Sequence, residues 1–167
     1  MQEVKTFKQS ELVLKVNRAY NTNLLDLSVW KPYIDRLCSD RPYQKEAIET
    51  AIIYLASGQY KSLVDLAEYN FLINPCLRDK YSSSQEFVKT LQMRDKLYGT
   101  TDLATGTGKS YVIYGIAQIA LGLGLVKRVL VLCPSLTIEH GLIEKFEGLS
   151  GDARLKALIP QDSICKN

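Results

Sequence analysis

The chain has 167 residues, of which 46% are apolar, and this size and composition are those of a folded domain rather than of a disordered or fibrous protein. Lys and Arg (21) slightly outnumber Asp and Glu (18), so the net charge of +3 neither indicates nor excludes nucleic-acid binding. No stretch approaches the roughly 20 apolar residues of a membrane span, and the start lacks the apolar run of a signal peptide. We therefore expect a cytoplasmic protein that does not enter a membrane.

The four cysteines, Cys38, Cys76, Cys133 and Cys165, are scattered without a Cys-x-x-Cys pair, and His140 is the only histidine. Zinc sites in proteins use Cys and His ligands at short, regular spacings. The sequence therefore predicts free, buried thiols in a reducing compartment rather than a zinc site.

Residues 1–40 are predicted to form a mostly helical lead-in, with Pro32 as a break. After this break, Tyr33, Ile34 and Leu37 have the spacing of one helical face, which we expect to pack on the core. No catalytic group stands out in this part of the chain.

A helix is predicted from about residue 42 to 57. Pro42 suits the first turn, apolar residues recur at helical spacing, and Gly58 suits a C-terminal cap. Gln44 lies in the first turn, and its amide can donate and accept at once, as recognition of the neighbouring polar edges of adenine requires. The alternative is that Gln44 is an ordinary solvent-exposed residue.

Residues 59–96 separate this helix from the next motif and are predicted to form a helical insertion. A first helix would stop at Asn74-Pro75, and Ser83 with Glu86 would form a capping box that opens a second helix. Basic and aromatic residues interleave along the segment. They indicate either a surface for a partner or DNA, or an ordinary solvated helix face.

The clearest motif is Leu103–Ser110, which reads Leu-Ala-Thr-Gly-Thr-Gly-Lys-Ser. Its Gly-Lys-Ser end is typical of a loop whose backbone N–H groups surround an oligophosphate, while the lysine reaches the terminal phosphates and the serine hydroxyl binds Mg²⁺. The full pattern has a glycine five residues before Gly108, where this chain has Leu103. A nucleoside triphosphate is the expected ligand, and a Gly/Thr turn with an exposed lysine is the alternative.

The flanks of this loop favour a short strand before it and a helix after it. Residues 97–103 include several extended-chain formers, although Gly99 and Asp102 weaken that prediction. Apolar residues recur at helical spacing from Tyr111 to Leu121. The loop is therefore predicted at a helix N-terminus, where backbone N–H groups point toward an anion.

The continuous apolar run Val129–Cys133 is predicted to form a strand that is covered on both faces. Pro134, Ser135 and Thr137 follow at the carboxyl end of this strand, where open α/β sheets bind their ligands. The two hydroxyls suit a nucleic-acid phosphate or the cap of a helix from Ile138 to Leu149, and the two roles are compatible.

Three ordered blocks together resemble the N-terminal motor domain of the DEAD/DEAH-like (superfamily 2) helicases, especially the motor subunits of type I and type III restriction enzymes. The blocks are Arg41-Pro-Tyr-Gln44, Ala104-Thr-Gly-Thr-Gly-Lys-Ser110, and Val131-Leu-Cys-Pro-Ser135 followed by Thr137. The resemblance covers about residues 40–150. In that family a leucine or methionine commonly precedes Ala-Thr-Gly-Thr-Gly-Lys, so Leu103 agrees with the resemblance.

The resemblance implies an α/β fold, namely an incomplete RecA-like P-loop NTPase domain with a parallel sheet flanked by helices. Residues 41–167 would form the N-terminal part of this motor domain, with the helical insertion at 59–96. It implies ATP and Mg²⁺ as cofactors and DNA as a partner, together with the remainder of the motor protein and a modification or specificity subunit.

The site residues follow from the same resemblance. Arg41 and Gln44 would lie near adenine, and Lys109 would be the catalytic residue. The sugar-phosphate backbone of DNA would contact the third block, at Pro134, Ser135 and Thr137. The loop residues on the triphosphate would be Thr105, Gly106, Thr107, Gly108, Lys109 and Ser110, of which Ser110 would also bind Mg²⁺.

The chain departs from the family pattern in two ways. The insertion is longer than the usual connection, and no Asp-Glu block follows Pro134 before Asn167 to hold magnesium and position the attacking water. The arginines of a second motor domain are also absent. We therefore expect the ATP-binding portion of a DNA helicase or translocase of a restriction or DNA-processing system, an N-terminal piece without rapid hydrolysis of its own. The alternatives are a non-hydrolysing nucleotide-binding or interaction module and another P-loop enzyme such as a kinase.

Overall fold

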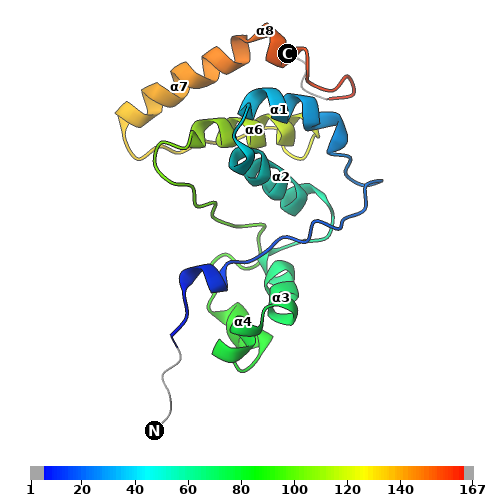
Figure 1. The fold of residues 1–167 in the computed structure, drawn as a ribbon, viewed down its shortest axis with the longest axis vertical. Helices are drawn as coiled ribbons and strands as arrows, with labels where there is room; N and C mark the ends of the chain where they lie inside the picture. The colour runs from blue at the N-terminus through cyan, green and yellow to red at the C-terminus, as the bar shows by residue number, and fades with distance from the viewer. Residues whose placement is uncertain (1–5, 164–167) are drawn as a thin grey trace.

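The computed structural model describes residues 6–163, and the regular secondary structure in this range is entirely helical (Figure 1). None of these helices is both long and apolar enough to cross a bilayer. The elements, in which η marks a short 3₁₀ helix, are η1 (Gln9–Leu12), η2 (Ser28–Trp30), α1 (Lys31–Cys38), α2 (Pro42–Ala56), α3 (Leu63–Ile73), α4 (Pro75–Lys80), α5 (Ser84–Lys89), α6 (Lys109–Gly122), α7 (Leu136–Gly151) and α8 (Ala153–Lys156).

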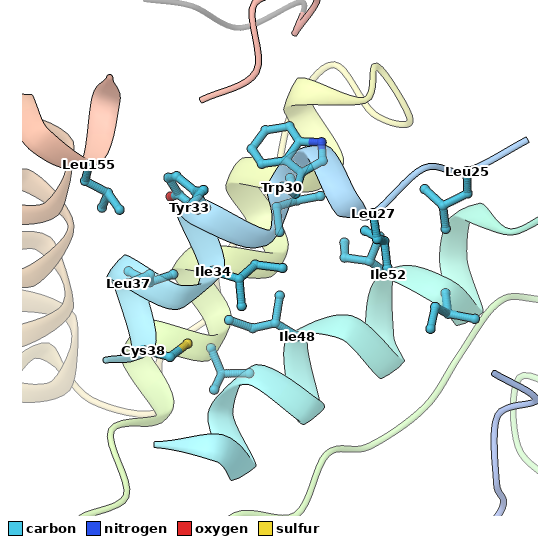
Figure 2. Packing of buried hydrophobic residues seen from close by; sticks show 13 residues of the cluster. Leu25, Leu27, Trp30, Tyr33, Ile34, Leu37, Cys38, Ile48, Ile52 and Leu155 are labelled. Atoms are coloured by element: carbon cyan, nitrogen blue, oxygen red, sulfur yellow. The ribbon is translucent and has the colours of Figure 1, made fainter. Parts of the chain in front are cut away.

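The larger part of the core lies between α1, α2 and α6 (Figure 2). Tyr33, Ile34 and Leu37 form the predicted apolar face of α1, and none of them is more than 4% exposed. They pack with Ile48 of α2, and burying an aliphatic side chain such as Ile34 or Leu37 contributes about 1.5–3 kcal/mol. Pro32 lies within the first turn of α1 rather than at a break, because the first turn needs no N–H from that residue.

Helix α6 approaches its neighbours closely because it carries glycine at the contacts. A Cβ atom on Gly115 would lie 2.6 Å from Ile48 Cδ1 and 2.8 Å from Leu37 Cδ2, and one on Gly122 would lie 2.5 Å from the Trp30 ring. Close-packed interiors have no room for such additions without moving the backbone. Gly115 therefore allows α6 to approach α1 and α2 closely, and Gly122 allows it to approach the Trp30 ring of η2.

The helices of the 59–96 segment pack with part of the N-terminal lead-in, at the opposite end of the molecule from α7 and α8 (Figure 1). The buried Asn70 side chain of α3 accepts from Lys15 N at 2.7 Å and donates to Lys15 O at 2.9 Å. Asn17 N donates to the Tyr60 hydroxyl at 2.9 Å. Lys15 lies in the non-helical stretch between η1 and η2. The Asn70 amide satisfies the backbone N–H and C=O groups of Lys15, as a neighbouring strand would.

The predicted helices around the insertion are confirmed, with differences at their ends. Helix α2 is followed by Gly58 at φ +73°, the left-handed conformation of a C-terminal cap. Asn74-Pro75 ends α3 as predicted, but it also begins α4. Asn74 accepts a hydrogen bond from Cys76 N at 3.0 Å, and Pro75 occupies the first helical position.

The predicted capping box at α5 is only half formed. Ser83 Oγ accepts from Glu86 N at 3.2 Å, whereas the Glu86 carboxylate accepts from Ser82 N at 2.8 Å instead of from Ser83 N. The Ser82 hydroxyl donates to the same carboxylate. These bonds hold the start of α5, which ends at Lys89.

The predicted parallel sheet is wrong for this structure, because no residue from 6 to 163 is in a β-strand. Residues 97–103 and Val129–Cys133 are both irregular. Leu130 is 82% exposed and Leu132 83% exposed, although the sequence predicted a strand covered on both faces. The run and α6 line an open apolar groove of about 490 Å³. A strand depends on hydrogen bonds to distant segments, and none of the described residues supplies such a ladder, whereas each helix satisfies its backbone groups locally.

The cysteines within the described residues are free thiols, as predicted, and Cys165 lies outside this range. Cys38 is fully buried in the core between α1 and α2, whereas Cys76 and Cys133 are only partly buried. Burial raises the pKa of the Cys38 thiol to about 11, so it is protonated at neutral pH. Cys38 therefore acts as a small apolar core residue rather than as a nucleophile.

Candidate nucleotide-binding site

The phosphate-loop motif forms a tight turn directly before α6. Thr107 closes this turn, because its N–H donates to Ala104 O at 3.4 Å and its hydroxyl donates to the same oxygen at 2.6 Å. Gly106 has φ +80° and Gly108 has φ +77°, a region that residues with a Cβ atom avoid. The two glycines thus allow the chain to reverse and to enter the helix within a few residues.

The loop is electrostatically suited to an anion. Helix α6 has 14 residues and no acidic residue in its first turn, so no side chain there neutralises the positive end of its dipole. Lys109 is exposed at the first helical position, and Ser110 beside it is partly buried. A helix N-terminus with free N–H groups and an adjacent ammonium is a favourable site for phosphate.

Gln44 lies against this loop, although it is 63 positions from Thr107 in the sequence. Its Nε2 donates to Thr107 O at 2.5 Å, and Gly108 O lies 3.5 Å from the same nitrogen. The side chain is 0% exposed, so the alternative of a solvent-exposed first-turn residue is wrong. Its Oε1 is buried without a hydrogen-bond partner, an arrangement that costs about 1–3 kcal/mol unless a ligand supplies a donor.

Tyr43 makes a second contact with the loop that the sequence did not predict. Its hydroxyl donates to Thr107 O at 3.3 Å, so two consecutive residues of α2 share one carbonyl of the loop. The signal available in the sequence was the position of Tyr43 inside the Arg41-Pro-Tyr-Gln44 block. The contact itself could not be predicted from the sequence, because it depends on the folded chain bringing the Tyr43 hydroxyl close to Thr107 O.

Arg41 is brought to the same end of α6 through an aromatic ring. Its guanidinium carbon lies 5.8 Å from the centroid of Tyr111, and Lys145 Nζ of α7 lies 5.2 Å from the same centroid. Cations at such distances are attracted to the ring face. Two cations beyond Lys109 are thus held beside the first turn of α6, and neither Tyr111 nor Lys145 was among the predicted site residues.

The third block lies at the start of α7. Pro134, Ser135 and Thr137 are all exposed, and Ser135 Oγ accepts from Ile138 N at 3.4 Å, which is the predicted capping contact. Side-chain contacts between α7 and α6 come from the middle of α7, where the rings of Phe146 and Tyr114 lie 5.3 Å apart. The structure therefore brings the first two blocks into direct contact, and it leaves the third block open to solvent.

The described residues fit a triphosphate better than they fit a complete magnesium site. The turn, the helix N-terminus and the buried, unpartnered Gln44 Oε1 all suit a bound nucleotide. For Mg²⁺, the motif assigns the Ser110 hydroxyl, and no group of three or more His, Cys, Asp or Glu residues within 6–163 is placed to hold a metal ion. Mg²⁺ often takes few protein ligands, because phosphate oxygens and waters complete its octahedron.

A comparison with protein-family models matches residues 37–166 to the type III restriction enzyme, res subunit. The chain belongs to this family. It is a family of superfamily 2 helicase N-terminal motor domains, so the resemblance predicted from the three blocks is confirmed. The match includes all three blocks and the insertion. Comparisons with curated proteins and with solved structures gave no match.

Proposed function

We propose that this chain is the ATP-binding portion of a DNA helicase or translocase of a restriction system, and that Leu103–Ser110 binds the phosphates of ATP with Mg²⁺. The observation that carries the proposal is the contact of Gln44 with Thr107, which joins two blocks that are far apart in the sequence. A solvated turn with an incidental lysine would not require a fully buried glutamine against its backbone.

Each residue then has a physical role. The backbone N–H groups at the N-terminus of α6 surround the phosphates, and the Lys109 ammonium reaches the terminal phosphates as a compact charge. The Ser110 hydroxyl is a Mg²⁺ ligand, and the bound ion neutralises charge on the phosphates. Arg41 and Gln44 Oε1 are assigned to the side of the site that receives the base.

DNA is the proposed macromolecular partner of the third block. The exposed Ser135 and Thr137 hydroxyls and the N-terminus of α7 offer donors that contact the phosphate backbone without reading base sequence. The remainder of the motor protein and a modification or specificity subunit are further proposed partners, in keeping with the res-subunit family.

One observation favours a second candidate, a nucleotide-binding module without turnover. No group of three or more His, Cys, Asp or Glu residues within 6–163 is placed to hold a metal ion, whereas hydrolysis needs a group that orients the attacking water. The two candidates share ATP binding and differ in hydrolysis. Phosphate release in the presence of single-stranded DNA separates them, because a motor turns over and a binding module does not.

Titration of the chain with ATP and Mg²⁺ tests the proposal, with Lys109→Ala as the decisive variant. We expect at least about a tenfold loss of affinity, because a hydrogen bond to a charged group contributes about 1.5–3 kcal/mol. Lys127→Ala is the matched control, because Lys127 is also exposed but follows the other end of α6. Equal affinities for the wild-type chain and Lys109→Ala would contradict the proposed site.

The DNA part is measured in the same preparation by fluorescence anisotropy with labelled single-stranded DNA. Thr137→Val keeps the shape of the side chain and removes its hydroxyl, so we expect weaker DNA binding and unchanged ATP binding. DNA affinity that is the same in Thr137→Val and in wild type, at low and at moderate salt, argues against Thr137 as a phosphate contact.

A further inference from the structure

Two consecutive residues of α7 contact two aromatic rings of α6. Lys145 Nζ lies 5.2 Å from the centroid of the Tyr111 ring. The centroids of the Phe146 and Tyr114 rings are 5.3 Å apart. Tyr111 and Tyr114 are three positions apart in one helix, so they share a face of it. The two contacts together place the Lys145 ammonium beside the first turn of α6, where the helix follows the phosphate loop.

The Tyr111 ring also lies against the loop itself. A Cβ atom on Gly108 would lie 3.2 Å from Tyr111 Cδ2, so a single side chain separates Lys145 from the loop backbone. Lys145 is exposed, and a lysine carries three donors on a flexible four-carbon stem. Its ammonium can therefore turn from the ring toward an anion that is bound at the loop.

The cations at this end of α6 have no counter-ion from the protein. None of the ion pairs among residues 6–163 includes Arg41, Lys109 or Lys145, whereas Lys45 and Arg18 are each paired with a carboxylate. Arg41 and Lys145 are moreover held beside the same Tyr111 ring, and like charges repel each other. Bound negative charge would relieve this repulsion, and a triphosphate carries more of it than Lys109 alone neutralises.

The sequence of α7 keeps carboxylates away from Lys145. Side chains three and four positions apart are neighbours on a helix, whereas those one and two positions apart do not face each other. Glu144 and Glu147, one and two positions away, therefore lie on other faces of α7. The residues that share the face of Lys145 are uncharged, and they are Gly141, Leu142, Gly148 and Leu149. Lys145 thus keeps its full charge for a ligand.

We propose that Lys145 is a second phosphate-binding lysine of the nucleotide site and that Tyr111 is the residue that positions it. This role rests on the proposed function of the loop. The ammonium donates to a phosphate oxygen from the side of α7, while Lys109 and the N-terminus of α6 hold the phosphates from the side of the loop. Because this contact is made to phosphate, it acts equally on ATP and on inorganic tripolyphosphate, which has no base.

The test titrates ATP and tripolyphosphate, each with Mg²⁺, into the wild-type chain and into Lys145→Gln. We expect a loss of affinity of about three- to tenfold for both ligands, since an exposed ammonium contributes less than a buried one. Lys156→Gln is the matched control, because Lys156 of α8 is also exposed and its loss changes the net charge equally. Lys145→Arg keeps the charge, and its affinity is expected to stay within about twofold of the wild type.

Two outcomes would overturn the role of Lys145. One is an affinity of Lys145→Gln that equals that of Lys156→Gln for both ligands. The other is a loss for ATP with unchanged tripolyphosphate binding, because it would place Lys145 on the base. A wild-type chain that binds neither ligand refutes the proposed function itself. If Lys109→Ala weakens binding and Lys145→Gln does not, only the role of Lys145 is refuted.

Tyr111→Leu tests the positioning role, because it removes the ring beside which Lys145 is held. We expect weaker binding of both ligands, and we expect Lys145→Gln to cost less in the Tyr111→Leu background than in the wild type. A double variant whose loss equals the product of the two single losses would show that the ring does not position Lys145. Melting midpoints show whether Tyr111→Leu is folded. Lys145→Gln changes only an exposed side chain and tests the phosphate contact independently.

Discussion

The segments that precede and follow α6 are stabilised in different ways. Before α6, the loop is bonded to α2 through Gln44, and α2 is anchored in the core by Ile48. After α6, whose last turn packs on Trp30, the chain continues into an irregular apolar run in which Leu130 and Leu132 are more than four-fifths exposed. The loop is held in place by one packed helix. An apolar run can form a buried strand only when neighbouring strands bond its backbone and other elements cover both of its faces.

The largest expected effect distinguishes the core that supports the loop before α6 from the apolar run after α6, by their contributions to stability. Ile48→Ala removes a fully buried side chain, and we expect it to lower the free energy of unfolding by about 2–5 kcal/mol. Leu130→Ala removes an exposed side chain from the apolar run after α6, and we expect a change within about 0.5 kcal/mol. Urea unfolding of both variants measures the contrast. A cost for Leu130→Ala equal to that of Ile48→Ala would mean that the apolar run is covered in solution.

Features that depend on neighbouring residues were predicted well from the sequence. The ends of α2 and α3 follow from Pro42, Gly58 and Asn74-Pro75, because caps and first turns depend on neighbouring residues. The sequence predicted the motif Leu103–Ser110 and its place at a helix N-terminus for the same reason. Family membership was also predicted, because it depends on the order of short blocks.

Predictions that depended on distant partners were less successful. The strand at Val129–Cys133 was predicted from apolar content alone, and residues 6–163 supply no ladder for it. Gln44 was predicted to contact adenine, and that role stays a prediction. Its bond to Thr107 joins residues 63 positions apart and cannot be read from either segment. The Tyr43 hydroxyl was missed because its partner is a backbone oxygen, which every residue has.

A second prediction concerns the loop before α6 alone. Gly108→Ala places a side chain at φ +77° and 2.6 Å from Gln44 Nε2, whereas Gly106→Ala at φ +80° meets no atom within 4 Å. Both changes carry the left-handed cost of about 1–2 kcal/mol. We expect Gly108→Ala to be less stable than Gly106→Ala in urea unfolding, because only Gly108 contacts Gln44. Equal stabilities would argue that the contact between Gln44 and the loop is loose.

The smallest expected effect depends on pH and involves the helix pair that supports the loop. Lys45 Nζ of α2 lies 2.7 Å from Asp35 Oδ1 of α1, and this hydrogen bond lowers the pKa of Asp35 below its ordinary value of 3.8. A carboxylate with a lowered folded-state pKa stabilises the fold above pH 3.8, and this contribution is lost as the pH falls through the folded-state pKa. Because the pair is partly exposed, its contribution is at most about 1 kcal/mol.

Asp35→Asn therefore tests whether the pair joins α1 to α2 in solution. We expect the unfolding free energy of the wild-type chain to fall more steeply below pH 3.8 than that of Asp35→Asn, and the two curves to converge in strong acid. Asp40→Asn serves as the control, because Asp40 is exposed just before α2. Parallel curves for the wild type and Asp35→Asn would show that glycine-mediated packing, rather than this ion pair, holds α1 and α2 beside the loop.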